Sequence, residues 1–311
     1  MRTLICGSLA FDTIMVFPDR FGRHILTDET HVLSVSFTVG EMRREWGGCA
    51  GNIAYNLRGI GGDPVVMGTL GRDGAAYRER LADLGIAADG VRMIDDAYTA
   101  QAFIITDLDD NQITAFHPGA MNESHRSAVA DVADVALGIV APDGKQGMQA
   151  HAAQFAASGI PFLFDPGQGL PLFSGAELGK LIDAATYVAV NDYEAKLLSE
   201  RTGWSIGEIA ERVDALVVTL GGEGSIIHAN GDTYAIAAAK PSAIVDPTGC
   251  GDAYRAGLLY GIAAGWDWQQ TGQLASVLGS LKIACRGGQN HPLDRERVDA
   301  HYRDAFGEHL W

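Results

Sequence analysis

The sequence predicts a doubly wound α/β/α domain with a small inserted β-sheet lid. Short apolar runs alternate with amphipathic helical patterns along most of the chain, as expected for parallel strands covered by helices on both faces. Strand-rich segments interrupt this alternation at residues 11–45 and 98–117, which we assign to the lid. Residues 1–10, 46–97 and 118–311 then form the α/β core.

Composition limits the classes of function. The chain has 311 residues, 47% of them hydrophobic, which is enough for one large core. A formal net charge of −16 disfavours binding to nucleic acid or an anionic membrane, because both need a basic face. No stretch approaches the roughly 20 apolar residues of a membrane span, and the N-terminus lacks a signal-peptide pattern. We therefore expect a cytoplasmic protein whose partners are small molecules.

The elements can be assigned in chain order. The first apolar run, residues 3–6, ends at a Gly-Ser pair, which is typical of a buried parallel strand that leads into a site. Residues 18–30 are predicted to be a polar connection, and a glycine-rich segment from Trp46 begins a helix. Asp73 precedes the helix 75–84 and is predicted to cap it. Further strands are predicted at residues 32–37, 64–70, 99–107, 112–117, 136–141, 161–164, 187–190, 215–219, 225–228 and 233–236, and further helices at 250–264 and 268–284.

The strongest candidate for chemistry is the stretch 244–257, where an apolar entry meets a glycine-rich turn that opens a helix. Gly249 and Gly251, on either side of Cys250, let the backbone approach a ligand, and the free N–H groups of the first helical turn favour an anion there. Asp252 lies in the same turn and can accept a proton from a hydroxyl group. The alternative interpretation is an ordinary turn with a helix cap.

Other candidate residues lie at the ends of predicted strands or the starts of helices, where ligands of α/β proteins collect. Asp12 is a single carboxylate in an apolar segment and needs a partner, unless it is exposed on an edge strand. Gly48 and Asn52 begin a helix, where backbone and an amide side chain can face a ligand. The remaining candidates at strand ends are Gln168, Asn191, Glu194, Thr219, Gly221, Gly222 and Gly224.

These motifs resemble those of the ribokinase-like (phosphofructokinase B) family of small-molecule kinases over nearly the whole chain. Asp-Pro-Thr-Gly-Cys-Gly-Asp at 246–252 is similar to the second family signature, with Pro and Cys in place of the usual Thr and Ala. Gly-Gly-x-x-x-Asn at 47–52 resembles the first signature. Asn-x-x-Glu at 191–194 resembles the element that supports the Mg²⁺–phosphate shell, and Thr-x-Gly-Gly-x-Gly at 219–224 resembles the loop that passes over the nucleotide.

Within this family, segments 47–55, 111–121, 164–173 and 190–196 look most like bacterial nucleoside kinases, often labelled adenosine kinases. The resemblance implies a ribokinase-like fold and a purine-salvage reaction, in which ATP phosphorylates the 5′-hydroxyl of a purine nucleoside such as adenosine, inosine or guanosine. Asp252 would be the base that accepts the proton of this hydroxyl. The protein would be a monomer or a homodimer. The amides of residues 249–251 would stabilise the transferred group.

The resemblance also implies ligands for the other parts of the site. Asp12, Gly48 and Asn52 would hold the ribose, and Gln168 would lie beside the nucleoside. The base would stack on an aromatic residue, Phe116, Phe11 or Phe17, and core or lid packing is the alternative role for each of the three. ATP would contact Asn191, Thr219, Gly221, Gly222 and Gly224; Mg²⁺ would be held through water by Glu194, and K⁺ by Asp246 and Thr248.

Three alternatives stay open at this point. A kinase for a free sugar, such as ribose or fructose, would use the same catalytic turn. A non-catalytic nucleoside-binding protein on the same fold would ordinarily lack the base, which is present as Asp252. A dinucleotide oxidoreductase is disfavoured, because Gly7-Ser8-Leu9 does not continue as Gly-x-Gly-x-x-Gly.

Overall fold

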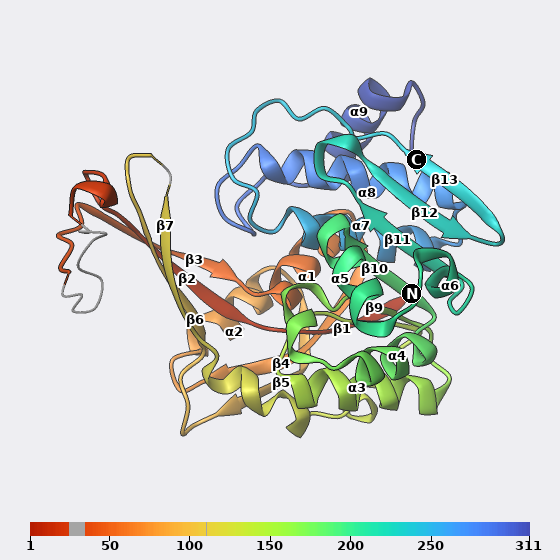
Figure 1. The fold of residues 1–311 in the computed structure, drawn as a ribbon, viewed down its shortest axis with the longest axis horizontal. Coiled ribbons are helices and arrows are strands. Elements are labelled where there is room, and N and C mark those ends of the chain that lie inside the picture. The colour runs from red at the N-terminus through yellow and green to blue at the C-terminus, as the bar shows by residue number, and fades with distance from the viewer. Residues whose placement is uncertain (25–34, 110) are drawn as a thin grey trace.

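A nine-stranded sheet forms the centre of the protein in the computed structural model, which describes residues 1–24, 35–109 and 111–311 (Figure 1). The strand order is β13-β12-β11-β10-β9-β8-β1-β4-β5, and neighbouring strands pair in parallel except β11 with β12 and β12 with β13. The strands are β1 (Arg2–Cys6), β4 (Asp63–Gly71), β5 (Ala87–Ile94), β8 (Leu137–Val140), β9 (Phe162–Phe164), β10 (Tyr187–Asn191), β11 (Ala215–Thr219), β12 (Ser225–Ala229) and β13 (Asp232–Ile236). The predicted doubly wound α/β class is confirmed.

Helices cover both faces of this sheet, because successive residues of each buried strand point to opposite faces. In β1, Ile5 belongs to one hydrophobic core, and Leu4 and Cys6 belong to the other. The first core includes residues of α1 (Cys49–Gly59), α2 (Ala75–Asp83), α7 (Cys250–Ala264), α8 (Trp268–Ile283) and α9 (Arg295–Phe306). The second includes residues of α3 (Lys145–Ser158), α4 (Gly175–Ala184), α5 (Asp192–Thr202) and α6 (Ile206–Ala210).

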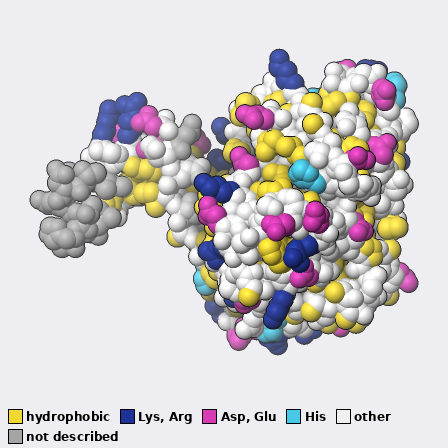
Figure 2. Space-filling view, turned by 45° about the vertical axis from the view of Figure 1, so that its right-hand side comes forward, with side chains coloured by type: hydrophobic (Ala, Val, Ile, Leu, Met, Phe, Trp, Pro, Cys, Tyr) yellow, Lys and Arg dark blue, Asp and Glu magenta, His cyan; other side chains and the backbone are white. Residues whose placement is uncertain are grey.

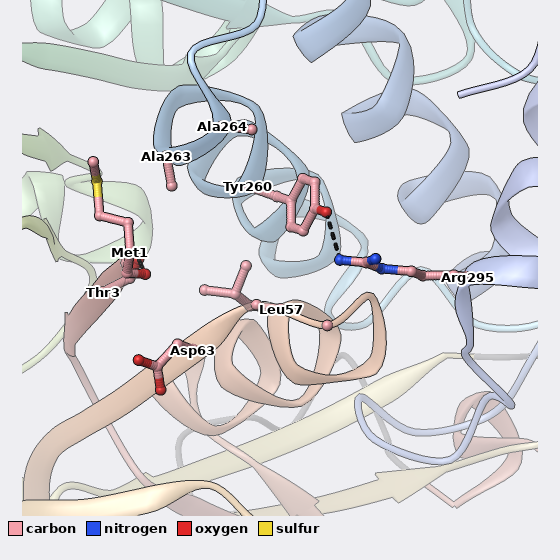
Figure 3. Close-up of a pocket in the computed structure, with 10 residues that line it drawn as sticks. Met1, Thr3, Leu57, Asp63, Tyr260, Ala263, Ala264 and Arg295 are labelled. Carbon is pink, nitrogen blue, oxygen red and sulfur yellow. Dashed lines mark hydrogen bonds between the residues drawn. The ribbon is translucent and has the colours of Figure 1, made fainter. Parts of the chain in front are cut away.

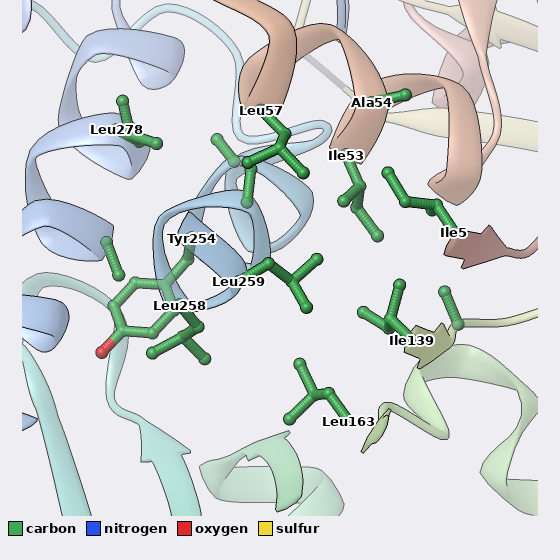
Figure 4. Packing of buried hydrophobic residues seen from close by; sticks show 14 of the residues in the cluster. Ile5, Ile53, Ala54, Leu57, Ile139, Leu163, Tyr254, Leu258, Leu259 and Leu278 are labelled. Carbon is green, nitrogen blue, oxygen red and sulfur yellow. The ribbon is translucent and has the colours of Figure 1, made fainter. Parts of the chain in front are cut away.

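The first core holds the two helices that carry the strongest motifs. Figure 4 shows Ile53 of α1 and Leu259 of α7 close to the sheet residue Ile139, and all three are fully buried. Truncating such a residue to alanine typically costs about 2–5 kcal/mol. The N-terminal turns of α1 and α7 are therefore held in a fixed relation by packing against the same strands.

A second sheet of four strands, which we call the lid, projects from the core (Figures 1 and 2). Its order is β3-β2-β6-β7, formed by β2 (Ala10–Val16), β3 (Glu41–Gly47), β6 (Ala100–Thr106) and β7 (Gln112–His117). β2 pairs with β3 on one side and β6 on the other, so Asp12 lies on an interior strand rather than an edge strand. The predicted inserted sheet is confirmed. In the described residues, no helix combines the length and apolar character needed to cross a bilayer.

Several predicted elements differ from the structure. Residues 32–34 of the predicted strand 32–37 lie outside the described residues, and residues 35–37 form no strand. The lid strand is instead β3, most of which lies within the predicted lid segment 11–45 but which was not predicted as a strand, because its four charged residues give no strand pattern. Trp46 and Gly47 are the last two residues of this strand, so the helix predicted from Trp46 begins at Cys49. Strand β5 and helix α9 were not predicted.

Asp73 does not cap α2 as predicted, because the N-cap is Gly74 and receives no side-chain hydrogen bond. The Asp73 carboxylate instead accepts hydrogen bonds from Thr99 N (2.7 Å) and Gln101 Nε2 (3.1 Å) at the start of β6. Arg44 of β3 lies 3.6 Å from the same carboxylate. Asp73 therefore ties a core loop to the lid.

Candidate active site

The candidate site lies where the order of the central strands reverses. In this sheet β1 is followed by β4 on one side, whereas its other neighbour β8 is followed by β9 on the opposite side, so the connections from these two adjacent strands run in opposite directions. Ligands of open α/β sheets bind at such a switch point. β2 of the lid begins four residues after β1 ends, which places the lid next to this edge of the sheet.

The N-terminus of α7 offers backbone amides to an anion. Gly249 is its N-cap and has φ of 78°, a conformation that favours glycine. Cys250 N donates to Pro247 O (3.2 Å) and Ala253 N to Gly249 O (2.9 Å), whereas the amides of Gly251 and Asp252 have no acceptor within the described part of the chain. The Cys250 amide therefore closes the turn, and the two following amides are available for a ligand.

Asp252 has the properties of a general base. Its Oδ2 accepts a hydrogen bond from Asn52 Nδ2 at 2.8 Å. The pKa of Asp252 is raised to about 6, chiefly by burial and also by the nearby Asp165 carboxylate, while the hydrogen bond from Asn52 and the charge of Arg255 act in the opposite direction. At neutral pH the carboxylate is thus ionised and more basic than an ordinary aspartate.

A chain of hydrogen bonds, which we call the base–lid chain, connects Asp252 to the lid. Asn52 Oδ1 accepts from Gln289 Nε2 (3.2 Å), and the same nitrogen donates to Tyr77 Oη (2.8 Å). Tyr77 Oη in turn donates to the carbonyl of Gly47, the last residue of β3 (2.7 Å). Asn52, predicted as a ribose ligand, therefore also holds the base. Tyr77 and Gln289 were missed, because no local pattern marks either residue.

A buried ion pair connects α7 to the end of strand β9. Arg255 Nε and Nη2 donate to the two carboxylate oxygens of Asp165 at 3.0 and 3.2 Å. Both side chains are less than a tenth exposed. Since Asp165 directly follows β9, the pair fixes the first turns of α7 against the end of that strand. Asp165 directly follows the predicted strand 161–164, but the sequence does not indicate that Arg255 is its partner.

Asp12 brings a second carboxylate to the site from the lid. A Cβ atom on Gly47 would lie 2.5 Å from Asp12 Oδ2, so only glycine fits beside this carboxylate. Burial raises the pKa of Asp12 to about 6, with further contributions from the charges of Asp246 and Glu45. The ionised form of an acid crowded by other acids is stabilised by hydrogen-bond donors, and hydroxyl groups of a ligand could serve as such donors.

Phe116 shares a face of the lid with Asp12. Asp12 is opposite Ala102 in the β2-β6 pair, and Ala102 is opposite Phe116 in the β6-β7 pair. Residues opposite each other in neighbouring strands point to the same face of a sheet. The Phe116 side chain is 50% exposed. The structure therefore leaves this aromatic ring accessible on the Asp12 face.

Other aromatic and substrate candidates are placed differently. Phe11 is buried against Trp46 and Tyr77. Phe17 is buried in a cluster within the lid, where its ring stacks on that of Phe21. These two rings are packing residues. Gln168 is exposed in the short helix η5 (Gly167–Leu172).

Gly48 is required by close packing of the backbone. It is the N-cap of α1 with φ of 85°, and a Cβ atom there would lie 2.5 Å from Ser8 O. Ser8 also accepts from the first turn of α1, from Cys49 N through its hydroxyl (3.1 Å) and from Ala50 N through its carbonyl (3.0 Å). Gly48 therefore allows the start of α1 to pack closely against Ser8, just after the end of β1. This packing determines the position of Asn52 in the first turns of α1.

The predicted nucleotide residues meet at the ends of two neighbouring strands. Asn191 and Thr219 are opposite each other in the β10-β11 pair. Asn191 Oδ1 accepts from Glu194 N (2.7 Å), and Glu194 Oε2 accepts from Asn191 N (2.8 Å), which makes Asn-x-x-Glu the capping box of α5. Burial raises the pKa of Glu194.

The glycine loop beyond β11 is open. Gly221 and Gly222 belong to the short helix η6 (Gly221–Glu223), and both are exposed with free space where a side chain would be. Gly224 follows with φ of 99°. A ligand over the ends of β10 and β11 could therefore lie directly on this backbone.

The predicted cation residues belong to a tight turn before α7. The Asp246 carboxylate accepts from Thr248 N (2.9 Å) and from Gly287 N (2.8 Å). These hydrogen bonds lower the pKa of Asp246, in opposition to its burial. The turn is thereby tied to the loop after α8, which also carries Gln289 of the base–lid chain.

A surface pocket of about 250 Å³ lies away from these residues (Figure 3). It is lined by Met1, Thr3 and Asp63 from the N-terminal ends of β1 and β4, and by Tyr260 and Arg295. Arg295 Nη2 donates to Tyr260 Oη at 2.8 Å. This pocket is at the opposite end of the strands from Asp252, so it is separate from the N-terminal turn of α7.

Free amides beside a basic carboxylate are what phosphoryl transfer to a hydroxyl group requires, so fold and site together define a small-molecule kinase. Comparison with known proteins agrees. The family model described as pfkB family carbohydrate kinase matches residues 15–295. The chain belongs to this family and is a phosphotransferase with an alcohol acceptor.

Similar proteins narrow the class. A nucleoside kinase of Methanothermobacter thermautotrophicus is 31% identical over 309 residues, covering 98% of this chain and 96% of the relative. The structure of Burkholderia thailandensis nucleoside kinase in complex with inosine is 53% identical, with a TM-score of 0.90 and 99% of each chain covered. The same enzyme in complex with ADP-inosine is 54% identical, with a TM-score of 0.88 over 99% of this chain and 97% of the other. The predicted ribokinase-like family and fold are confirmed.

Proposed function

We propose that the protein transfers the γ-phosphoryl group of ATP to the 5′-hydroxyl of a purine nucleoside, giving ADP and the nucleoside 5′-monophosphate. The observation that carries this proposal is the first turn of α7, where Asn52 holds the Asp252 carboxylate beside two free amides. The purine acceptor is supported by the inosine complex of the B. thailandensis relative, and an adenine nucleotide as donor is supported by its ADP-inosine complex.

The reaction needs one proton transfer and one displacement. Asp252 takes the proton of the 5′-hydroxyl while the hydroxyl oxygen bonds to the γ-phosphorus and the bond from that phosphorus to the ADP oxygen breaks. A pKa of about 6 keeps Asp252 ionised at pH 7 and gives it more basicity than an ordinary aspartate. The amides of Gly251 and Asp252, and the N-terminus of α7 around Gly249, stabilise the charge on the equatorial oxygens.

The lid supplies the acceptor side of the site. Asp12 accepts hydrogen bonds from ribose hydroxyls, which relieves the crowding of its charge by Glu45 and Asp246. Asn52 keeps its second Nδ2 hydrogen for the same sugar. Phe116 lies two strands from Asp12 on the same face, a distance of about 10 Å at the usual strand spacing, which suits a base attached to the bound ribose.

The nucleotide side has groups that fit ATP and Mg²⁺. The open backbone at Gly221 and Gly222 can lie along the nucleotide, and Asn191 and Thr219 lie beside it at the strand ends. Glu194 keeps one carboxylate oxygen free of protein donors in the described residues. Burial raises its pKa, and a nearby cation would stabilise its ionised form. A single carboxylate with water suits Mg²⁺, which would neutralise phosphate charge when bound.

A coupled assay of ADP release tests the proposal against its alternatives. Adenosine, inosine, guanosine, cytidine, ribose and fructose are compared at saturating ATP, with ATP alone as the blank. We expect turnover with purine nucleosides and a product identified as the 5′-monophosphate by ³¹P NMR. Turnover with ribose or fructose alone would make the enzyme a sugar kinase. Binding of inosine without ADP release would indicate a non-catalytic nucleoside-binding protein.

A further inference from the structure

A buried lysine lies directly behind the catalytic turn. Lys282 is in the last turn of α8, and its side chain is fully buried. Its Nζ donates to the carbonyl oxygens of Asp246 (2.8 Å) and Cys285 (3.0 Å). Among the described residues, Lys282 forms no ion pair with an acidic side chain within 4.0 Å. A fully buried ammonium group is thus held by backbone carbonyls rather than by a counter-ion.

A positive charge surrounded by backbone carbonyl oxygens is the arrangement found in a binding site for a monovalent cation. An ammonium group without compensating contacts would be strongly destabilised in the interior. Here the carbonyl dipoles and the negative end of α8 compensate the charge, because Lys282 and Cys285 are at the C-terminus of that helix. The charge of Lys282 also helps to lower the pKa of Asp246.

The oxygen atoms of Asp246 that could ligate a monovalent ion already accept hydrogen bonds. The carbonyl of Asp246 accepts from Lys282, and its carboxylate oxygens accept from Thr248 N and Gly287 N. A K⁺ ion ligated by Asp246 and Thr248, as the family resemblance implies, does not fit beside an ammonium group already bonded to the same residue. The residues at this position therefore accommodate the covalently attached ammonium group of Lys282 rather than a K⁺ ion bound from solution.

We propose that Lys282 is a positioning residue whose ammonium group serves this chain as a built-in monovalent cation, so that phosphoryl transfer does not depend on K⁺. The carbonyl it holds begins the turn 246–249, which ends at the N-cap of α7. Val245 N and Asp246 N both donate to Ile283 O (2.9 and 3.1 Å), so the same end of α8 fixes the turn from two sides. Lys282 thereby orients the free amides of Gly251 and Asp252.

This inference rests on the proposed kinase function. The first measurement distinguishes a failure of the inference about Lys282 from a failure of the kinase function. Wild-type kcat is measured with the best nucleoside in potassium, sodium, ammonium and tetramethylammonium chloride at constant ionic strength. We expect values within about twofold of each other, since steps that need no bound ion respond only to screening. Activation by potassium of more than about fivefold over tetramethylammonium would overturn the inference but not the kinase function. Absence of turnover with every acceptor would overturn the kinase function itself.

Two substitutions then test the lysine directly. Lys282→Met keeps the length of the side chain without its charge, and Lys282→Ala leaves space for a small cation. Both should lose at least roughly tenfold in kcat in tetramethylammonium, the effect of about one hydrogen bond to a charged group. Potassium or ammonium should restore Lys282→Ala and leave Lys282→Met low. Lys240→Met removes an exposed lysine and should behave as the wild type.

Thermal unfolding gives a readout that does not need turnover. Potassium should raise the Tm of Lys282→Ala and leave the Tm of the wild type unchanged, because only the variant has an open cation site. A folded Lys282→Ala that no cation restores, or either variant with full activity in tetramethylammonium, would overturn the proposal. If neither variant folds, the wild-type cation series decides alone.

Discussion

Replacing Asn52 with leucine should move the acidic limb of the pH profile of kcat/KM to higher pH. Asn52 Nδ2 donates to Asp252 Oδ2 at 2.8 Å, and this hydrogen bond stabilises the ionised carboxylate. A hydrogen bond to a charged group contributes about 1.5–3 kcal/mol, and one pKa unit corresponds to about 1.36 kcal/mol. Loss of the donor should therefore raise the pKa of Asp252 from about 6 to roughly 7–8.

The direction of this shift in the pH profile follows from the proposed role of Asp252 as the base. Asp252 accepts a proton only when it is ionised, so activity rises with pH through its pKa. At pH 7 about nine tenths of the wild-type base is ionised, against roughly half to less than a tenth in the variant. At about pH 9 the base is mostly ionised in both proteins, and the difference that depends on the base should nearly vanish.

The pH profile also separates the two roles of Asn52. A lost contact with ribose would lower kcat/KM by the same factor at every pH, whereas a lost contact with Asp252 moves the limb along the pH axis. Initial rates with inosine and adenosine from about pH 5 to about pH 9.5 measure both effects. Asn122→Leu, an exposed position in η3 (Gly119–Arg126), is the control and should leave the profile unchanged.

Two results would refute this reasoning. If the limb lies at the same pH in Asn52→Leu and in the wild type, the hydrogen bond does not stabilise the ionised base. If the wild-type limb lies below about pH 5, the surroundings of Asp252 do not raise its pKa as the structure indicates.

Four further predictions concern the base, the lid carboxylate and the lid. Asp252→Asn should lower kcat by roughly 10²–10⁴ with ATP affinity, measured by calorimetry, little changed; the control is Asp304→Asn on α9, and a rate above half of the wild type would remove Asp252 from the base role. Asp12→Ala should lower kcat/KM by about one to two decades, the effect of a charged hydrogen bond; if variant and wild type discriminate equally between adenosine and 2′-deoxyadenosine, Asp12 does not contact the 2′-hydroxyl. Because the pKa of Asp12 is raised to about 6 in the folded protein, wild-type stability should fall as pH rises from about 4 to about 6. Asp12→Asn should then be more stable than the wild type at about pH 7.5, by up to about 3 kcal/mol, and not at about pH 4; a lower Tm of this variant at the higher pH would contradict the assignment. Saturating nucleoside should slow hydrogen exchange in hairpin 98–117 more than an ATP analogue does and leave β10 nearly unchanged; equal exchange with and without nucleoside would make the lid a fixed wall or a subunit contact.

The catalytic turn could be predicted from the sequence because its geometry is local. Gly249, Gly251 and Asp252 lie within four residues, and an anion-binding helix N-terminus needs only a turn and the helix that follows it. The alternating strands and helices could be predicted for the same reason, since each short apolar run carries its own signal.

Residues that act through distant partners could not be predicted. Asn52 looked like a residue facing substrate, and its acceptor Asp252 is 200 positions away. Lys282 in the last turn of a helix has the pattern of a solvated cation near a helix C-terminus, and only the approach of Asp246 makes it a buried one. Asp73 had the sequence position of a cap, but β6 of the lid supplies better donors.

The lid strand β3 was missed for a related reason. Glu41, Arg43, Arg44 and Glu45 give it no alternation of apolar and polar residues. A strand of a thin sheet exposed on both sides does not need such alternation, because neither face is a continuous core. Its position is set instead by pairing with β2 and by Tyr77, which donates to its last carbonyl.

The hydrogen bond between Asn52 and Asp252 also determines when the enzyme can become active during its synthesis. Contacts between residues so far apart form late, because the intervening chain must be ordered first. At about 5–20 residues per second, a ribosome needs roughly 10–40 seconds to proceed from Asn52 to Asp252. Throughout this interval the nascent chain carries Asp12, the proposed ribose ligand, but not Asp252, the proposed base. In the proposed mechanism phosphoryl transfer can therefore begin only after Asp252 has been made, and a product that ends before this residue should have no kinase activity.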